Sequence, residues 1–143
     1  MEEKVEKILV PVDGSDCGKK AFQWAASLAK AYEAKLLLLY VVDLNQKLSA
    51  LDRMAMSGYE PAAFKLEGEK LLASYEKEAP AVSITSMVRL GSPSEQIVDA
   101  AEKCKADLIV MGSRGENQMK QVMMGSVSQY VLHHALCPVM VVR

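Results

Sequence analysis

Five short apolar runs divide this chain, and segments with a helical period lie between them. Most of the runs are nearly continuous in Ile, Leu, Val and Met, without the polar alternation of a strand that has one face in water. Continuously apolar strands are typical of a parallel sheet that is covered on both faces. The expected strands are Lys7–Val12, Ala34–Val42, Val82–Leu90, Asp107–Gly112 and Pro138–Val142.

The intervening segments carry apolar residues at the spacing of one helix face. The first of these stripes includes Trp24, which we therefore expect in the core. The third helix has a clear start signal, in which Ser92 is expected to cap the helix and Glu95 to close a capping box. The stripes predict helices at Asp16–Glu33, at Pro61–Ala79, from Ser92 through Cys104, and around Val127–His134.

Strict alternation of strands and helices predicts an α/β fold, a doubly wound five-stranded parallel sheet with helices on both faces, formed by residues 1–143 as a single domain. The third strand is half polar and belongs at an edge, whereas the first and fourth are the most apolar and belong in the centre. This pattern fits the strand order 3-2-1-4-5. Ligands bind such sheets where the winding reverses, here near Val12–Gly14 and Met111–Gly112.

The fifth strand, Pro138–Val142, would form the other edge, and it is apolar with no charge before Arg143. A bare apolar edge invites pairing with another chain, so we expect a homodimer through this strand. The alternative is that a helix or the N-terminal segment covers it. The connection Asp43–Glu60 is longer than structureless loops usually are, which is typical of a lid, a binding loop or a mobile segment.

Charge and hydropathy exclude several classes of protein. Seventeen basic and 18 acidic residues give a net charge of −1, which disfavours a general binder of nucleic acid or of anionic membranes. The longest apolar run, Leu36–Val42, is far shorter than the ~20 residues that span a bilayer. No secretory signal is visible, and three cysteines without close spacing favour reduced thiols in the cytoplasm.

A glycine-containing stretch follows the first strand, from Pro11 to Lys20. It resembles a phosphate-binding P-loop only superficially, because Lys20 stands where that loop needs a magnesium-binding Ser or Thr. We interpret it as a strand-to-helix turn with Ser15 or Asp16 as the N-cap. The carboxylate of Asp13, at the strand end, suits hydrogen bonds from a ribose hydroxyl or an adenine amino group.

A second glycine-rich stretch follows the fourth strand and has the spacing Gly-x2-Gly-x9-Gly-Ser. Glycines let a backbone approach a phosphate closely, and a helix N-terminus adds free amides with partial positive charge. Hydroxyls of Ser126 and Ser128 and the charges of Arg114 and Lys120 add to an anion site. Glycines after a strand also make ordinary turns, which is the alternative. The spacing is met by Gly112, Gly115, Gly125 and Ser126.

This motif resembles the nucleotide-binding motif of the universal stress protein family, ATP-binding subclass. Further stretches resemble that family in order along essentially the whole chain, except from about Leu44 to Tyr59. They are Ile8–Ser15, Gly91–Pro93 with Ile97, Asp107–Gly115, Gly125–Ser128 and His133–Val139.

The resemblance implies a Rossmann-like domain of the adenine nucleotide alpha hydrolase-like type, cytoplasmic and dimeric, with ATP at the carboxyl edge of the sheet. Pro11, Val12 and Asp13, with Val41 or Val42, would line the adenine and ribose side. A magnesium or manganese ion would bridge the phosphates, since no carboxylate cluster is visible that would hold a metal unaided. The phosphates would be held by Gly112, Gly115, Gly125, Ser126, Val127 and Ser128.

Three functions remain open from the sequence. The first is an ATP-binding regulatory protein, in which the nucleotide shifts conformational populations. The second is a slow ATPase, for which Arg114 and Lys120 supply charge, but no base is obvious beyond Glu116, the carboxylate nearest in sequence. The third is a nucleotide-free dimeric scaffold.

Overall fold

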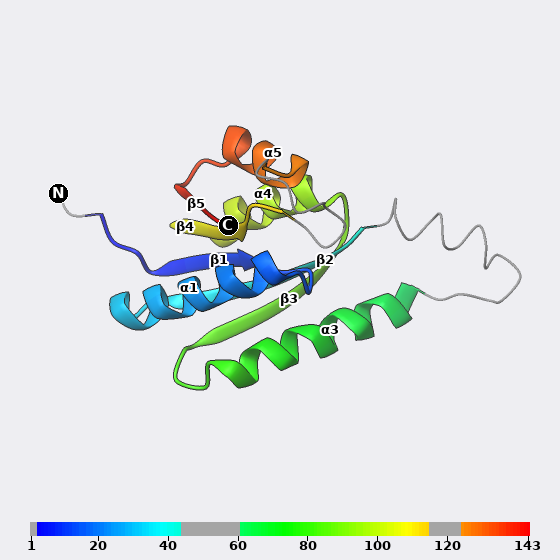
Figure 1. The fold of residues 1–143 in the computed structure, drawn as a ribbon, viewed down its shortest axis with the longest axis horizontal. Coiled ribbons are helices and arrows are strands. Elements are labelled where there is room, and N and C mark those ends of the chain that lie inside the picture. The colour runs from blue at the N-terminus through cyan, green and yellow to red at the C-terminus, as the bar shows by residue number, and fades with distance from the viewer. Residues whose placement is uncertain (1–2, 44–60, 115–123) are drawn as a thin grey trace, which may run out of the picture.

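A five-stranded parallel sheet forms the centre of the computed structural model, which describes residues 3–43, 61–114 and 124–143 (Figure 1). The strand order β3-β2-β1-β4-β5 confirms the predicted topology. Helices alternate with strands as expected. The elements are β1 (Lys7–Pro11), α1 (Asp16–Tyr32), β2 (Lys35–Asp43), α3 (Pro61–Glu78), β3 (Ile84–Gly91), α4 (Pro93–Cys104), β4 (Leu108–Gly112), α5 (Ser126–His134) and β5 (Val139–Val142).

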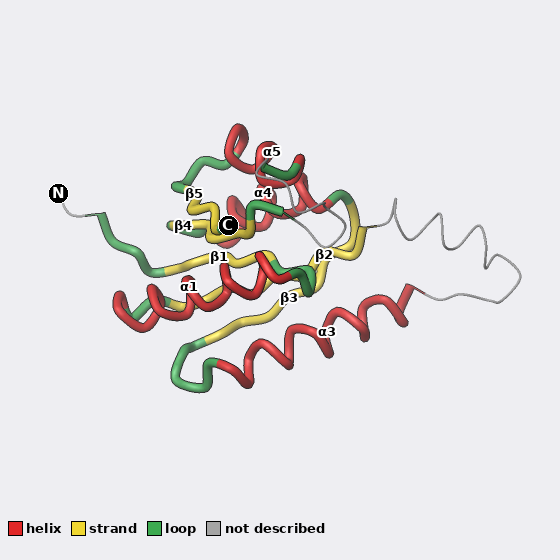
Figure 2. Tube along the Cα trace, viewed as in Figure 1, coloured by secondary structure: helices red, strands yellow, loops and turns green. Residues whose placement is uncertain are grey.

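Two hydrophobic cores, one on each face of the sheet, follow from the alternation of side chains along the strands. In β1, Ile8 and Val10 pack with α1 and α3, whereas Leu9 between them packs with α4 and α5. Each strand of the centre is therefore apolar on both faces, as the continuous runs predict. Figure 2 shows the loops that follow β1, β3 and β4 gathered at one end of the sheet.

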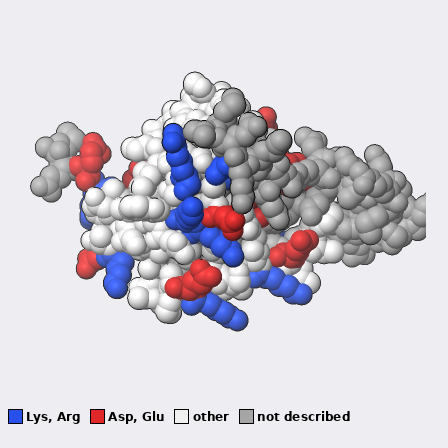
Figure 3. Space-filling model, in the orientation of Figure 1, with Lys and Arg blue, Asp and Glu red and all other residues white. Residues whose placement is uncertain are grey.

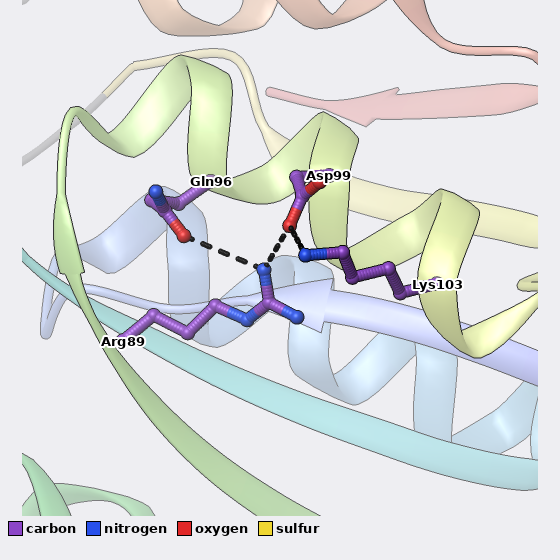
Figure 4. A network of polar contacts seen from close by, with 4 residues as sticks. All are labelled: Arg89, Gln96, Asp99 and Lys103. Atoms are coloured by element: carbon purple, nitrogen blue, oxygen red, sulfur yellow. Dashed lines mark hydrogen bonds and ion pairs between the residues drawn. The ribbon is translucent and has the colours of Figure 1, made fainter.

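The edge strand β3 is tied to α4 by a polar network (Figure 4). Arg89 Nη1 donates to Asp99 Oδ2 at 2.6 Å, and Lys103 Nζ lies 3.2 Å from the same oxygen. These hydrogen bonds, with that from Arg89 the larger effect, hold the pKa of the Asp99 carboxyl below its usual range. The polar residues that marked this strand as an edge thus fix a helix to it.

Two sequence predictions are wrong in detail. Trp24 is not in the core, because its side chain is 54% exposed. The small residues Ala21, Ala25 and Ala29 form the buried centre of α1, and Trp24 lies on the rim of that stripe. Ser92 is the N-cap residue of α4, but its side chain makes no capping hydrogen bond, and its Oγ lies 3.3 Å from Ser94 Oγ instead.

The surface shown in Figure 3 carries basic and acidic side chains interspersed, without a large patch of one sign on that face. This distribution agrees with the nearly neutral net charge of −1. Within the described ranges, no helix combines the length and the apolar character needed to cross a bilayer.

Candidate functional site

A cavity of about 590 Å³ opens at the carboxyl edge of the sheet, between the ends of β1 and β4. This is the switch point at which the strand order reverses, where the sequence predicts a ligand. Walls come from β2 and α3 on one side and from the α5 N-terminus on the other. The lining residues are Pro11, Val12, Asp13, Gly14, Ser15, Gly18, Tyr40, Val41, Asp43, Glu67, Leu71, Pro93, Ile97, Met111, Gly112, Ser113, Arg114, Gly125, Ser126, Val127 and Ser128.

The structure brings together the described residues that the sequence singled out for a ligand, with one exception. Val42 is 1% exposed and belongs to the core, whereas its neighbour Val41 lines the cavity. Successive residues of a strand point to opposite faces of the sheet, so only one of Val41 and Val42 can line the cavity. Gly115, like Lys120 and Glu116, lies outside the described residues, as does the stretch 44–60 that the sequence marks as a lid or binding loop.

At the end of β1, the chain makes the predicted strand-to-helix turn. Asp13 Oδ1 accepts a hydrogen bond of 3.0 Å from the Ser15 amide, and Gly14 adopts a φ of +88° that favours glycine. Ser15 Oγ then caps α1 by accepting from the Gly18 amide at 3.1 Å. This turn holds the Asp13 carboxylate at the rim of the cavity.

Gly112, the last residue of β4, lies against the first turn of α1. A Cβ at this position would lie 2.8 Å from Cys17 Cβ and 2.9 Å from the Cys17 carbonyl carbon. Glycine at position 112 therefore allows α1 to pack closely on β4. The sequence had indicated only that this glycine lets a phosphate approach the backbone. A side chain at this position would therefore disturb the packing of α1 on β4.

The N-terminus of α5 forms the opposite wall and is braced by hydrogen bonds. Gly125 donates its amide to the Ser113 carbonyl at 2.7 Å. The Ser128 hydroxyl lies 3.0 Å from both the Ser113 and the Gly125 carbonyl oxygens, and Ser128 is 1% exposed. Its proton is thus engaged by backbone, so Ser128 positions this wall rather than presenting a donor to a ligand.

The first-turn amides of α5 have no acceptor within the helix, and the N-cap residue Gly125 has no side chain to cap them. Ser126 and Val127 place these amides on the cavity. Arg114, half-buried, is the one basic residue among the described lining residues, and its Nη2 lies 3.9 Å from Cys17 Sγ. A helix N-terminus and a guanidinium are groups that attract anions.

The side of the cavity under β2 and α3 carries carboxylates and apolar side chains, which the sequence did not reveal. Asp43 ends β2, and Glu67 and Leu71 come from α3. The predicted strand order would have placed Asp43 at the site, because β2 neighbours β1. In the described part of the chain, no group of three or more His, Cys, Asp or Glu residues is arranged to hold a metal ion.

Comparisons with known proteins agree with this geometry. Residues 4–143 match the model of the universal stress protein family. A universal stress protein of Methanocaldococcus jannaschii is 36% identical over 99% of this chain and 84% of its own length.

Among solved structures, universal stress protein UspA from Lactobacillus plantarum superimposes with a TM-score of 0.77, at 32% identity, over 99% of this chain and 100% of its own. A universal stress protein solved in complex with cAMP has a TM-score of 0.71 at 25% identity, over 99% of this chain and 98% of its own. The chain belongs to the universal stress protein family.

Proposed function

We propose that this protein binds ATP in the cavity at the switch point and acts as a nucleotide-dependent regulatory protein. The observation that carries the proposal is that one cavity has the α5 N-terminus, with glycine at its N-cap, on one side and carboxylates on the other. The related structure solved with cAMP supports a nucleotide in this fold.

The two sides of the cavity orient the nucleotide. The phosphates lie at the α5 side, where the amides of Ser126 and Val127 and the Arg114 guanidinium attract anions. Base and ribose lie at the β1 and β2 side, where Asp13 accepts a hydrogen bond and Val41 provides apolar contact. Gly112 and Gly125 shape the floor between them.

A magnesium or manganese ion would be held through the phosphates rather than by the protein alone. The described residues supply no carboxylate cluster for it, and the one basic lining residue, Arg114, does not neutralise a triphosphate. When bound, the ion supplies charge neutralisation. Arg114 and the α5 amides hold the outer phosphate oxygens.

Binding rather than hydrolysis is the favoured activity. The described carboxylates that line the cavity are Asp13 in the turn after β1, Asp43 at the end of β2 and Glu67 on α3, and none of them is on the α5 wall. No base therefore faces the proposed position of the γ-phosphate from the described residues. A ligand at about 1,000 times its Kd stabilises the folded form by about 4 kcal/mol, enough to shift a conformational equilibrium.

We also propose a homodimer through β5, in the cytoplasm, where the free thiols of Cys17, Cys104 and Cys137 persist. On α1, Phe22 packs against Tyr75 of α3. Trp24 is two residues further along the helix, about 200° around its axis. Trp24 therefore faces the opposite side of α1, toward β5. On the other face, Leu132 is 41% exposed and Leu136 is 85% exposed beside the same strand. Exposed apolar side chains thus flank the β5 edge on both faces, as a second copy of the chain requires.

The nucleotide proposal is tested by denaturing freshly purified protein and identifying the released small molecules by mass spectrometry. Calorimetric titration of nucleotide-free protein with MgATP follows. We expect an adenine nucleotide in the released fraction and micromolar binding. A nucleotide-free protein that also shows no heat of binding would favour the scaffold alternative.

The dimer is tested by light scattering on the wild type and on a variant with Trp24→Lys and Leu136→Lys. Both side chains are exposed, so the variant keeps its fold, and we expect the dimer to become a monomer. Leu66→Lys, on exposed α3 surface, is the control and should remain dimeric. A monomeric wild type would exclude the interface.

A further inference from the structure

The α3 wall of the cavity lies outside the glycine motif that identified the site from the sequence. It carries the carboxylate of Glu67, to which the proposed function assigns no role. Glu67 lines the cavity and forms no hydrogen bond or ion pair with any other described residue. Leu71, one turn further along α3, lines the cavity beside it. The α3 wall therefore presents one acceptor next to an apolar surface.

Close packing fixes the α3 wall in place. Gly68 lies so close to β2 that a Cβ there would be 2.5 Å from Tyr40 Cδ1 and 3.3 Å from Val88 Cγ2. Tyr40 itself lines the cavity. Further along α3, the Tyr75 ring packs edge-on against Phe22 of α1, with ring centroids 5.1 Å apart. Glu67 thus adjoins the residue at which the helix backbone touches the sheet, so its Cα has a defined position.

The charges at this side of the cavity decide which ligand groups can lie there. Asp13, Asp43 and Glu67 line it, and the one described basic lining residue, Arg114, follows β4 on the far side of β1. A phosphate is repelled from this side, whereas a hydrogen-bond donor on an apolar ring is attracted. Carboxylates accept hydrogen bonds and donate none when ionised.

We infer that Glu67 is a specificity-determining residue, which accepts a hydrogen bond from the exocyclic amino group of the nucleobase. The inference rests on the proposed nucleotide function and extends it. Glu67 selects bases that carry an amino group on the edge facing α3, with the ring against Leu71 and Val41. A base without that donor cannot form this hydrogen bond with the carboxylate and binds more weakly.

The test compares the affinities of ATP and of purine riboside 5′-triphosphate, which lacks the amino group, by calorimetry with magnesium present. We expect the wild type to prefer ATP by roughly tenfold, the value of one hydrogen bond to a charged group. Glu67→Met should bring the ratio of the two affinities close to one by weakening ATP alone. Glu67→Gln keeps an acceptor and should retain part of the preference.

Glu69→Met is the matched control, because Glu69 lies on the same helix but faces a separate groove between α3 and β3. It should leave the ratio at the wild-type value. If the wild type and Glu67→Met both bind the two nucleotides and show the same ratio of affinities, the role of Glu67 is overturned while the proposed function stands. Failure of the wild type to bind either nucleotide would instead overturn the proposed function.

Discussion

The two sides of the cavity are built from different parts of the polypeptide. On the α5 side, the groups that can attract an anion are backbone amides and the Arg114 guanidinium, and Gly125 and the Ser128 hydroxyl brace the backbone there. On the α3 side they are side chains, among them Asp43 at the end of β2 and Glu67 on α3. Where backbone amides form a binding site, many side-chain substitutions are tolerated as long as the backbone keeps its conformation. Where side chains form it, each substitution removes a contact even if the backbone is unchanged.

The largest expected effect is on the α5 side of the cavity, from Gly112→Ala. The new Cβ meets the Cys17 backbone, which cannot rotate away, so we expect the free energy of unfolding to fall by about 2–3 kcal/mol. Urea denaturation measures it. Ser126→Ala, an exposed residue on the same wall, should change stability by less than about 0.5 kcal/mol. An unchanged midpoint for Gly112→Ala would contradict the close packing of Gly112 on Cys17.

Ser128→Ala should have the next largest effect. It removes a buried hydroxyl that lies within hydrogen-bond distance of the carbonyls of Ser113 and Gly125, so stability should fall by about 1–2 kcal/mol. ATP affinity should fall with it, because the α5 wall loses its brace. Denaturation and calorimetry on one preparation separate the two effects. A loss of affinity with full stability would assign the hydroxyl to the ligand instead.

Asp13→Asn should have a smaller effect, on the carboxylate side of the cavity. The amide oxygen of Asn can still accept from the Ser15 amide, so the turn and the stability should be preserved. ATP affinity should fall about fivefold, since a charged acceptor becomes neutral. Inorganic tripolyphosphate, which has no base, should bind as well as before or more tightly. Equal losses for both ligands would contradict the separation of the two sides.

The smallest effect concerns Tyr75, beneath the carboxylate side. Burial, and then the charges of Asp13 and Glu78, raises the pKa of its hydroxyl to about 12. The unfolded chain loses this proton near pH 10 and the folded chain near pH 12, so stability contributed by the neutral phenol is complete below pH 10 and is lost as pH rises through that window.

Tyr75→Phe should therefore abolish this part of the alkaline loss, measured by denaturation at pH 8 and pH 11. At pH 8 it should be neutral or stabilising by up to about 1 kcal/mol, because the Tyr75 hydroxyl is buried without a partner among the described residues. Tyr32→Phe, at a 58% exposed site, is the control. An alkaline loss that persists undiminished in Tyr75→Phe would assign it to other groups.

The fold was predictable because the signals are local and repeated. Apolar runs covered on both faces predict a parallel sheet, and the polar residues of the third strand, such as Arg89, place it at an edge. Trp24 was wrongly predicted to be buried because helical periodicity identifies the apolar face of a helix. It does not show which edge of that face another element covers. Ser92 failed as a side-chain cap although the start of its helix was correct.

The backbone side of the site was predictable for the same reason, since glycine spacing is a local signal. The roles within it were not. Sequence does not show that Gly112 meets Cys17, or that the Ser128 hydroxyl is engaged by carbonyls, because both depend on contacts between separate elements. Glu67 gave no signal, since a glutamate beside an apolar stripe is normally a solvated residue.

The most direct test of the two-sided cavity is amide chemical-shift mapping by NMR, with MgATP and with magnesium tripolyphosphate. We predict that both ligands shift the amides of Ser126 and Val127 at the α5 N-terminus. Only ATP should also shift those of Val41 and Asp43 at the end of β2. Tripolyphosphate shifts centred on β2, or ATP shifts that leave α5 untouched, would contradict the account.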